Sequence, residues 1–256
     1  MMKEWLIYWM YAVDKHSLQS PFIYSFFDHF IRNRSYTENP KIESLKSELK
    51  SNHKIIDIED FGAGSVVNNR LRRSVAYIAK TSTSSTRFSI LLHNLIEKYQ
   101  FTQVLELGSS LGLNTLYMSA AQVENLQIQT IEGSKEIAVI AADNFAELNA
   151  NNIKLHVGNI DDLLTPIVLE MNQIDLAYLD ANHTYEATIR YFEKISDKIH
   201  ENSIVVIDDI HWSPEMKKAW KTLISHPKVT HSADIYDAGI LFFKEGLQKK
   251  HFILEF

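Results

Sequence analysis

The 256-residue sequence predicts an α/β protein: a doubly wound, seven-stranded, mostly parallel sheet with a C-terminal antiparallel hairpin and a helical N-terminal extension. Three observations predict it. An apolar strand-like run at 104–107 leads through a turn of small residues into a helical pattern. Strand-like and helical segments then alternate up to residue 225, and near the C-terminus two strand-like runs are joined by only a short link.

The N-terminal part is expected to form a helical extension or lid over residues 1–75, and the main domain spans 76–256. Residues 1 to about 35 are rich in aromatic side chains, and Ser20-Pro21 fits a helix start with proline in the first turn. So many large apolar side chains need a surface to cover. We expect this segment to pack on the main domain or on a second subunit, so that a homodimer is one expected assembly.

Between this segment and the first strand of the alternation, local patterns predict two helices and two loops. Residues 36–54 are polar and lysine-rich, which predicts a solvated helix. The glycine-rich stretch Asp60–Ser65 is expected to be a flexible loop, with a lid over the site as its second use. Residues 66–80 are expected to be a basic helix, and the Ser/Thr run 81–86 a loop that ends in a helix cap.

From there the alternation is regular. The expected strands are 104–107, 127–131, 153–157, 176–179 and 204–207. The expected helices are 87–99, 113–122, 135–149, 161–171, 185–199 and 214–225. The last two strand-like runs, 229–236 and 240–244, are linked too briefly for a crossover helix, so they must be antiparallel.

Composition excludes several classes of function. A formal net charge of -6 argues against a general nucleic-acid binder, which needs a basic face. The absence of cysteine excludes disulfides, thiolate metal sites and cysteine nucleophiles. The apolar stretch Trp5–Val13 is too short to span a bilayer, and a docking helix is favoured over a membrane-surface helix. We expect a cytoplasmic protein with neither a nucleic-acid nor a membrane partner.

The turn after the first strand of the alternation is a candidate nucleotide site. Gly108 and Gly112 allow a tight bend and a close approach to a ligand. Their spacing matches neither the Gly-x-Gly-x-x-Gly fingerprint nor a P-loop. Glu106, just before the turn, would repel a phosphate but attract a cation, which favours a ligand with an amino group and a sulfonium. Glu132 ends the next strand about 20 residues on, where an acid can accept hydrogen bonds from ribose hydroxyls; the alternative is a surface charge.

Polar residues also follow the later strands, and ligands of open α/β sheets bind at these carboxyl ends. Asn159 follows the third strand. The runs Asp180–His183 and Asp208–His211 follow the fourth and fifth strands, and each places a histidine just after an aspartate.

These residues carry a resemblance. Glu106, Gly108, Ser110, Gly112, Glu132 and the terminal hairpin together resemble a class I S-adenosylmethionine-dependent methyltransferase, over roughly residues 76–256. Ser110 departs from the pattern, since most members have a glycine there. The resemblance implies a Rossmann-like methyltransferase fold with S-adenosylmethionine as cofactor, whose adenine edge Asn159 would reach.

A narrower resemblance concerns the later strands. Asp180–His183 is similar to the Asp-Ala-Asp-Lys motif of metal-dependent catechol and caffeoyl-CoA type O-methyltransferases, and Thr81-Ser82 matches a Thr-Ser pair ahead of that family's first strand. Asp208-Asp209 stands where that family has Asp-Asn.

The narrower resemblance implies specific roles. Asp180, Asp208 and Asp209 would bind a divalent cation such as Mg²⁺, and His183 would replace the family's lysine as base. Thr81, Ser82 and Asp180 would contact the cofactor. The alternative is that one aspartate binds the cofactor and the others cap the next helix.

The predicted reaction is methyl transfer to a small molecule, with oxygen as the favoured acceptor atom. Methyl transfer from a sulfonium is a direct displacement, so positioning supplies much of the acceleration. A metal, His183 or His211 would help the acceptor lose its proton, and Tyr185 and Trp212 could line its pocket. The alternatives are N-methylation, a protein of this fold that only binds cofactor, and a nicotinamide dehydrogenase, against which the glycine spacing and the hairpin argue.

Overall fold

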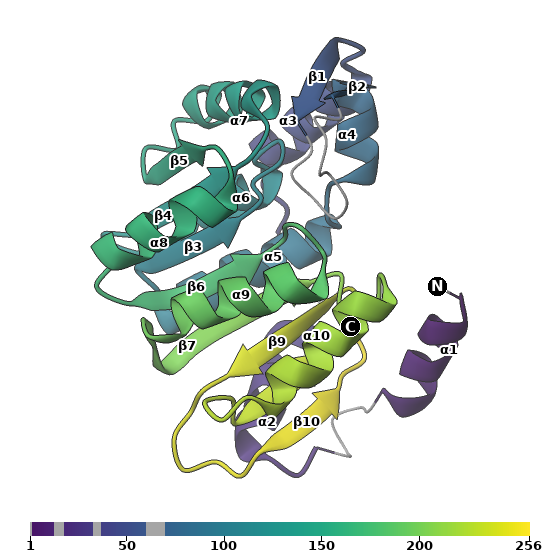
Figure 1. Ribbon diagram of the computed structural model, residues 1–256, viewed down its shortest axis with the longest axis vertical. Helices are drawn as coiled ribbons and strands as arrows, with labels where there is room; N and C mark the ends of the chain where they lie inside the picture. Colours follow the sequence, from purple (N-terminus) through teal and green to yellow (C-terminus); the bar gives the residue numbers. More distant parts are fainter. Residues whose placement is uncertain (1, 13–17, 33–36, 60–69) are drawn as a thin grey trace. The chain divides into compact units, whose positions relative to one another are not determined.

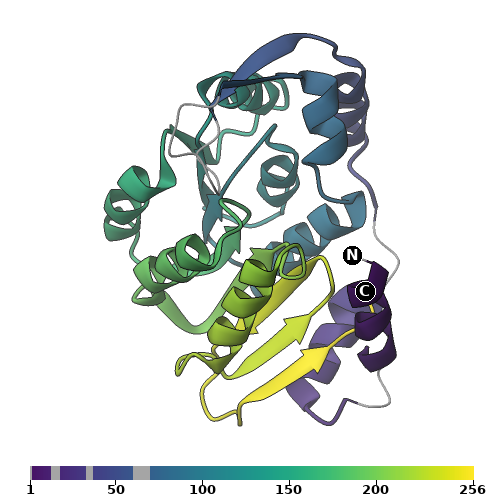
Figure 2. The ribbon, with the colours of Figure 1, turned by 45° about the vertical axis from the view of Figure 1, so that its right-hand side comes forward.

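The computed structural model describes residues 2–12, 18–32, 37–59 and 70–256. The chain divides into two compact units, which Figures 1 and 2 draw as ribbons: Tyr36–Met171, and Met1–Ser35 together with Asn172–Phe256. The predicted loop Asp60–Ser65 lies outside the described residues, and the predicted domain boundary after residue 75 stays a prediction.

Three parallel strands form the sheet of the unit 36–171. β4 (Gln127–Glu132) lies between β3 (Gln103–Leu107) and β5 (Ile153–Val157). The helices of this alternation are α5 (Thr86–Tyr99), α6 (Leu113–Ser119), α7 (Lys135–Glu147) and α8 (Ile160–Glu170). The predicted cap before α5 is confirmed, because the Ser85 side chain accepts a hydrogen bond from the Phe88 N–H.

The same unit contains a small antiparallel hairpin that the sequence did not predict. β1 (Ile55–Glu59) pairs with β2 (Arg70–Ser74), so the prediction of a helix over 66–80 is wrong for residues 70–74. Helical structure begins only at α4 (Val75–Thr81), which Ser74 caps. The strand forms because its partner β1 supplies a ladder, a contact that a local pattern does not contain.

α3 (Pro40–Ser51) is a helix, as predicted, but it is not fully solvated. One face buries Ile42, Leu45 and Leu49 in a core shared with Leu116 and Phe145, among others. This packing ties α3 to the helices that flank the glycine turn.

The unit formed by 1–35 and 172–256 contains five strands in the order β10-β8-β9-β7-β6. Their bounds are β6 (Ile174–Leu179), β7 (Ile199–Asp208), β8 (His231–Asp234), β9 (Ala238–Phe242) and β10 (Lys250–Ile253). β6 and β7 are parallel, and β9 is antiparallel to both β7 and β8. The helices α9 (Tyr185–Ser196) and α10 (Pro214–Ser225) complete the alternation.

The predicted fold class is confirmed. Parallel strands alternate with helices, and an antiparallel hairpin follows them. β10, which pairs in parallel with β8, was not predicted, so the described residues add one strand to the expected seven.

The N-terminal residues are helical, as predicted, with α1 (Met2–Tyr11), α2 (Pro21–Phe26) and a π-helical continuation, η2 (Phe27–Arg32). Their aromatic side chains partly cover their own unit: the rings of Phe22 and Phe26 meet Phe242 edge-on at 5.2 and 5.0 Å, and the Tyr8 hydroxyl donates to the Leu254 carbonyl. None of the described helices has the length and apolar character needed to cross a membrane.

Candidate functional site

The turn between β3 and α6 adopts a conformation that few side chains tolerate. Gly108, Ser110 and Gly112 have φ of 93°, 48° and 80°, and a Cβ on Gly112 would lie 2.3 Å from the Phe145 ring. Gly112 therefore lets the turn pack directly on α7. Ser110 accepts its positive φ without being glycine, and its backbone N–H points to a carboxylate.

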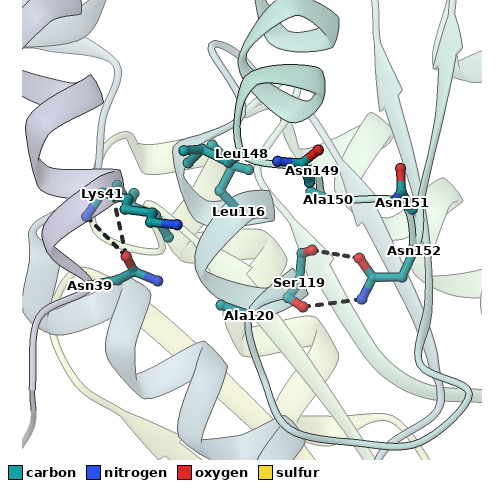
Figure 3. Close-up of a pocket in the computed structure, with 11 residues that line it drawn as sticks. Asn39, Lys41, Leu116, Ser119, Ala120, Leu148, Asn149, Ala150, Asn151 and Asn152 are labelled. Atoms are coloured by element: carbon teal, nitrogen blue, oxygen red, sulfur yellow. Dashed lines mark hydrogen bonds between the residues drawn. The ribbon is translucent and has the colours of Figure 1, made fainter.

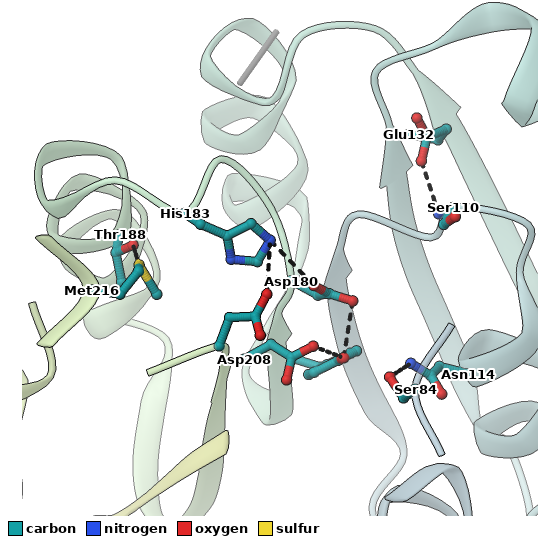
Figure 4. A network of polar contacts seen from close by, with 11 residues as sticks. Ser84, Ser110, Asn114, Glu132, Asp180, His183, Thr188, Asp208 and Met216 are labelled. Carbon is teal, nitrogen blue, oxygen red and sulfur yellow. Dashed lines mark hydrogen bonds and ion pairs between the residues drawn. The ribbon is translucent and has the colours of Figure 1, made fainter. Parts of the chain in front are cut away.

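That carboxylate is Glu132, at the end of β4. Figure 4 shows Ser110 facing it: the Ser110 N–H donates to Glu132 Oε2 at 2.8 Å. The Ser134 N–H donates to Oε1 at 2.9 Å. Burial raises the pKa of Glu132, and these backbone donors act in the opposite direction. Glu132 thus holds the conformation of the turn, and a carboxylate with about four acceptor positions still has one for a ligand beyond its backbone donors.

Glu106, in β3, is fully buried and only half satisfied. Its Oε2 accepts hydrogen bonds from the hydroxyls of Thr115, at 2.5 Å, and Thr130, at 2.7 Å. Its Oε1 is buried and has no hydrogen-bond partner among the described residues. Desolvation raises the pKa of this carboxyl to about 7, against the effect of both hydroxyls. A buried acceptor without a donor fits a ligand that brings a positively charged donor.

Three predicted cofactor contacts lie at helix ends in this unit. The Thr81 hydroxyl donates to the Tyr77 carbonyl within α4, and Ser82 follows it on the surface. The side-chain oxygen of Asn159 caps α8 through the Asp161 N–H at 3.0 Å. Their roles toward a cofactor stay predictions.

A different pair of serines is tied to the helix that follows the glycine turn. Asn114, in the first turn of α6, donates to the Ser84 hydroxyl at 2.9 Å and accepts from Ser89 at 2.6 Å. Figure 4 shows the pair Ser84 and Asn114. The Ser/Thr loop is thus anchored through residues a few positions beyond the predicted Thr81 and Ser82.

In the other unit, two aspartates meet on one tyrosine hydroxyl. The Tyr178 hydroxyl lies 3.0 Å from Asp180 Oδ2 and 2.8 Å from Asp208 Oδ2. Burial raises the pKa of Asp208 well above its ordinary value, and the charge of Asp180 adds to the effect. We call Asp180 and Asp208 the acid pair.

His183 lies beside this pair (Figure 4). Its Nε2 is 3.6 Å from Asp180 Oδ1 and 3.9 Å from Asp209 Oδ2, and its side chain is 30% exposed. An accessible imidazole in this position is a candidate general base.

The three aspartates implied as metal ligands do not form a metal centre in this arrangement. Within 2–12, 18–32, 37–59 and 70–256, no cluster of three or more His, Asp or Glu side chains is placed to hold an ion. The acid pair is bridged by Tyr178, while Asp209 turns toward His183. The donor set therefore does not fit the cation that the narrower resemblance implies.

His211, the second predicted base, belongs to a separate dyad. Its Nε2 lies 2.7 Å from Asp234 Oδ2, and its ring stacks on Tyr236 at 5.4 Å. Its Nδ1 is buried without a hydrogen-bond partner in the described part of the chain. Asp234 therefore fixes the orientation of the ring but leaves one ring nitrogen unused. Trp212, predicted as an acceptor contact, follows with 62% of its surface exposed.

A cavity of about 460 Å³ lies elsewhere in the unit 36–171 (Figure 3). Asn39 and Lys41 line it from the start of α3, Ser119 from the end of α6, and Asn149 and Asn152 from the loop before β5. The glycine turn precedes the opposite end of α6, so this cavity is not part of the candidate nucleotide site.

Sequence reasoning missed the residues that support the predicted ones. Thr130 is the partner of Glu106 in the β3–β4 register, and Tyr178 lies two residues before Asp180, so strand alternation places the two on one face. Asp234 is the only acidic residue in the strand-like run 229–235. The first of these signals depends on strand pairing, whereas the other two are present in the sequence itself.

Comparisons with known proteins agree with this fold and turn. Residues 105–210 match the family model described as a methyltransferase domain. "Uncharacterized protein R132" of Acanthamoeba polyphaga mimivirus is 24% identical over 157 residues, which is 56% of this chain and 69% of that protein.

Two solved structures share the fold over most of the chain. The O-methyltransferase TomG from Streptomyces achromogenes, in complex with S-adenosylmethionine, is 18% identical with a TM-score of 0.63, covering 86% of this chain and 96% of TomG. An O-methyltransferase from Bacillus cereus, in complex with S-adenosylhomocysteine, is 16% identical with a TM-score of 0.62, covering 84% and 96%. The resemblance to class I methyltransferases, and the fold it implies, are confirmed.

Proposed function

We propose that this protein transfers a methyl group from S-adenosylmethionine to an oxygen atom of a small-molecule acceptor. The observation that carries the proposal is the glycine turn with the unpaired Glu106 Oε1 beneath it, inside the residues that match a methyltransferase domain. Oxygen is favoured as acceptor atom because both proteins of like fold described above are O-methyltransferases.

The chain's part in cofactor binding follows from the turn. Glu106 Oε1 accepts a hydrogen bond from the positively charged amino group of S-adenosylmethionine. A buried acceptor that had no donor thereby becomes part of an ion pair. Glu132 keeps Ser110 in its positive-φ conformation and offers its remaining acceptor position to the ribose hydroxyls. When bound, S-adenosylmethionine supplies an activated methyl group, so the chain's main task is alignment.

The acceptor must lose a proton, and His183 is the residue we propose to take it. Its Nε2 faces Asp180 and Asp209, and its ring is accessible, as a general base must be. His211 is the second candidate, oriented by Asp234. No step is assigned to a metal, because the donor set does not fit one.

Calorimetric titration with S-adenosylhomocysteine tests cofactor binding. Wild type and Glu147→Gln, a surface change on α7, should bind alike, while Glu132→Ala should lose most of the affinity because the turn loses its clamp. If wild type shows no binding, the enzyme proposal fails; if Glu132→Ala binds as wild type does, the assignment of this turn fails.

A turnover assay with a panel of catechols and other phenols tests the base. His183→Ala should lower kcat by roughly a hundredfold or more, the range of general-base catalysis, with little change in affinity for S-adenosylhomocysteine. His211→Ala is the comparison. Full activity in both variants would remove histidine as the base.

A further inference from the structure

The acid pair is held together by a buried tyrosine hydroxyl. Tyr178 is fully buried in β6, and its hydroxyl lies within hydrogen-bond distance of one oxygen of Asp180 and one of Asp208. The two aspartates come from neighbouring parallel strands, because Leu179 of β6 is in register with Ile207 of β7. The pair and its bridge therefore rest on two rigid elements of one unit.

Two partly buried carboxylates this close to each other need a donor or a cation between them, since each repels the other. Here the donor is the Tyr178 hydroxyl. A Mg²⁺ ion instead needs several oxygen ligands at about 2.0–2.1 Å in octahedral geometry. The hydroxyl occupies Oδ2 of both Asp180 and Asp208, while Asp180 Oδ1 and Asp209 Oδ2 face the His183 imidazole.

We infer that the Tyr178 hydroxyl takes the place of a divalent cation in holding Asp180 and Asp208, so that this chain neither binds a cation at the acid pair nor needs one for turnover. Tyr178 is thus a positioning residue: it fixes Asp180, which in turn faces His183. The claim about turnover rests on the proposed function, whereas the claim about cation binding does not.

Mn²⁺ binding, followed by electron paramagnetic resonance of the full chain without cofactor, tests the claim directly. Wild type should show no saturable binding up to millimolar Mn²⁺. Tyr178→Phe keeps the ring and removes only the hydroxyl, so the acid pair should gain one Mn²⁺ equivalent, and adding Asp208→Asn should abolish the gain. Tyr117→Phe is the matched control, because its buried hydroxyl donates to a carboxylate oxygen of Glu43, and both residues belong to the unit 36–171. It should behave as wild type.

Each outcome decides the inference. Stoichiometric Mn²⁺ on wild type that Asp208→Asn removes would overturn it, and so would a folded Tyr178→Phe that gains no Mn²⁺. The wild-type titration needs no variant, so the inference can be overturned even if Tyr178→Phe does not fold. In turnover, EDTA should change the wild-type rate less than twofold, and a rate restored only by Mg²⁺ would also overturn it. S-adenosylhomocysteine binding reports separately on the proposed function.

Discussion

Replacing Glu106 with glutamine should make the unit 36–171 insensitive to a pH change that weakens wild type. The glutamine has nearly the same shape, and its carbonyl oxygen can still accept from Thr115 and Thr130. It carries no charge at any pH. The substitution therefore removes only the cost of ionising a fully buried carboxyl.

The magnitude follows from the raised pKa. An unfolded chain releases this proton near the ordinary value of 4.5, while the folded chain keeps it until about 7. Between these values the folded state binds more protons, so stability present at low pH is lost as pH rises through that window. The loss reaches about 3 kcal/mol above pH 7, at 1.36 kcal/mol per pKa unit. Glu106→Gln should not show this loss. Its free energy of unfolding should therefore rise relative to that of wild type by about 3 kcal/mol between pH 4.5 and pH 8.

Hydrogen exchange of the β3 and β4 amides is the assay, because all four tryptophans lie in the other unit, at positions 5, 9, 212 and 220. Exchange free energies, corrected for the intrinsic pH dependence of exchange, are compared at each pH. Tryptophan fluorescence serves as a control and should change alike in both proteins. A difference between variant and wild type that stays constant from pH 4.5 to pH 8 would refute the raised pKa.

Three further changes test individual contacts. Gly112→Ala combines a strained positive φ with a Cβ that meets the Phe145 ring, so urea unfolding should show a loss of about 2–4 kcal/mol; an unchanged midpoint would contradict the close packing. Asp234→Asn weakens the contact with His211 and should cost about 1–3 kcal/mol in thermal unfolding, with S-adenosylhomocysteine affinity unchanged. Tyr8→Phe removes the bond that holds α1, so α1 amides should exchange faster while those of β6 do not; equal rates would show that the bond is not formed.

The alternation and the glycine turn could be predicted because both depend on local signals. Pro214 after Ser213 marks the start of α10, and the short link before Gly239 forces an antiparallel pair, since no crossover fits in it. Glu132 could be placed at a strand end by spacing alone. These features follow from constraints on the local backbone, which do not depend on contacts with distant segments.

The remaining features depend on contacts between distant segments. β2 was mistaken for a helix because only the partner strand β1 makes Arg70–Ser74 extended. The prediction of Asp180 and Asp208 as metal ligands did not include the Tyr178 hydroxyl, because the motif contains the aspartates but not the side chain between them. The prediction that Glu132 would hold the ribose did not include its hydrogen bonds from Ser110 and Ser134.

The predicted cofactor turn and the predicted metal site therefore differ in how reliably a sequence motif predicts the local structure. A turn of positive-φ residues can form in few ways, so its glycines indicate its conformation from the sequence alone. An acidic cluster has no such constraint, because one neighbouring hydroxyl decides whether carboxylates share a donor or a cation. In this chain Tyr178 supplies that hydroxyl. The replacement of lysine by His183 fits the same reading, since a proton acceptor flanked by carboxylates can activate an acceptor oxygen without a Lewis acid.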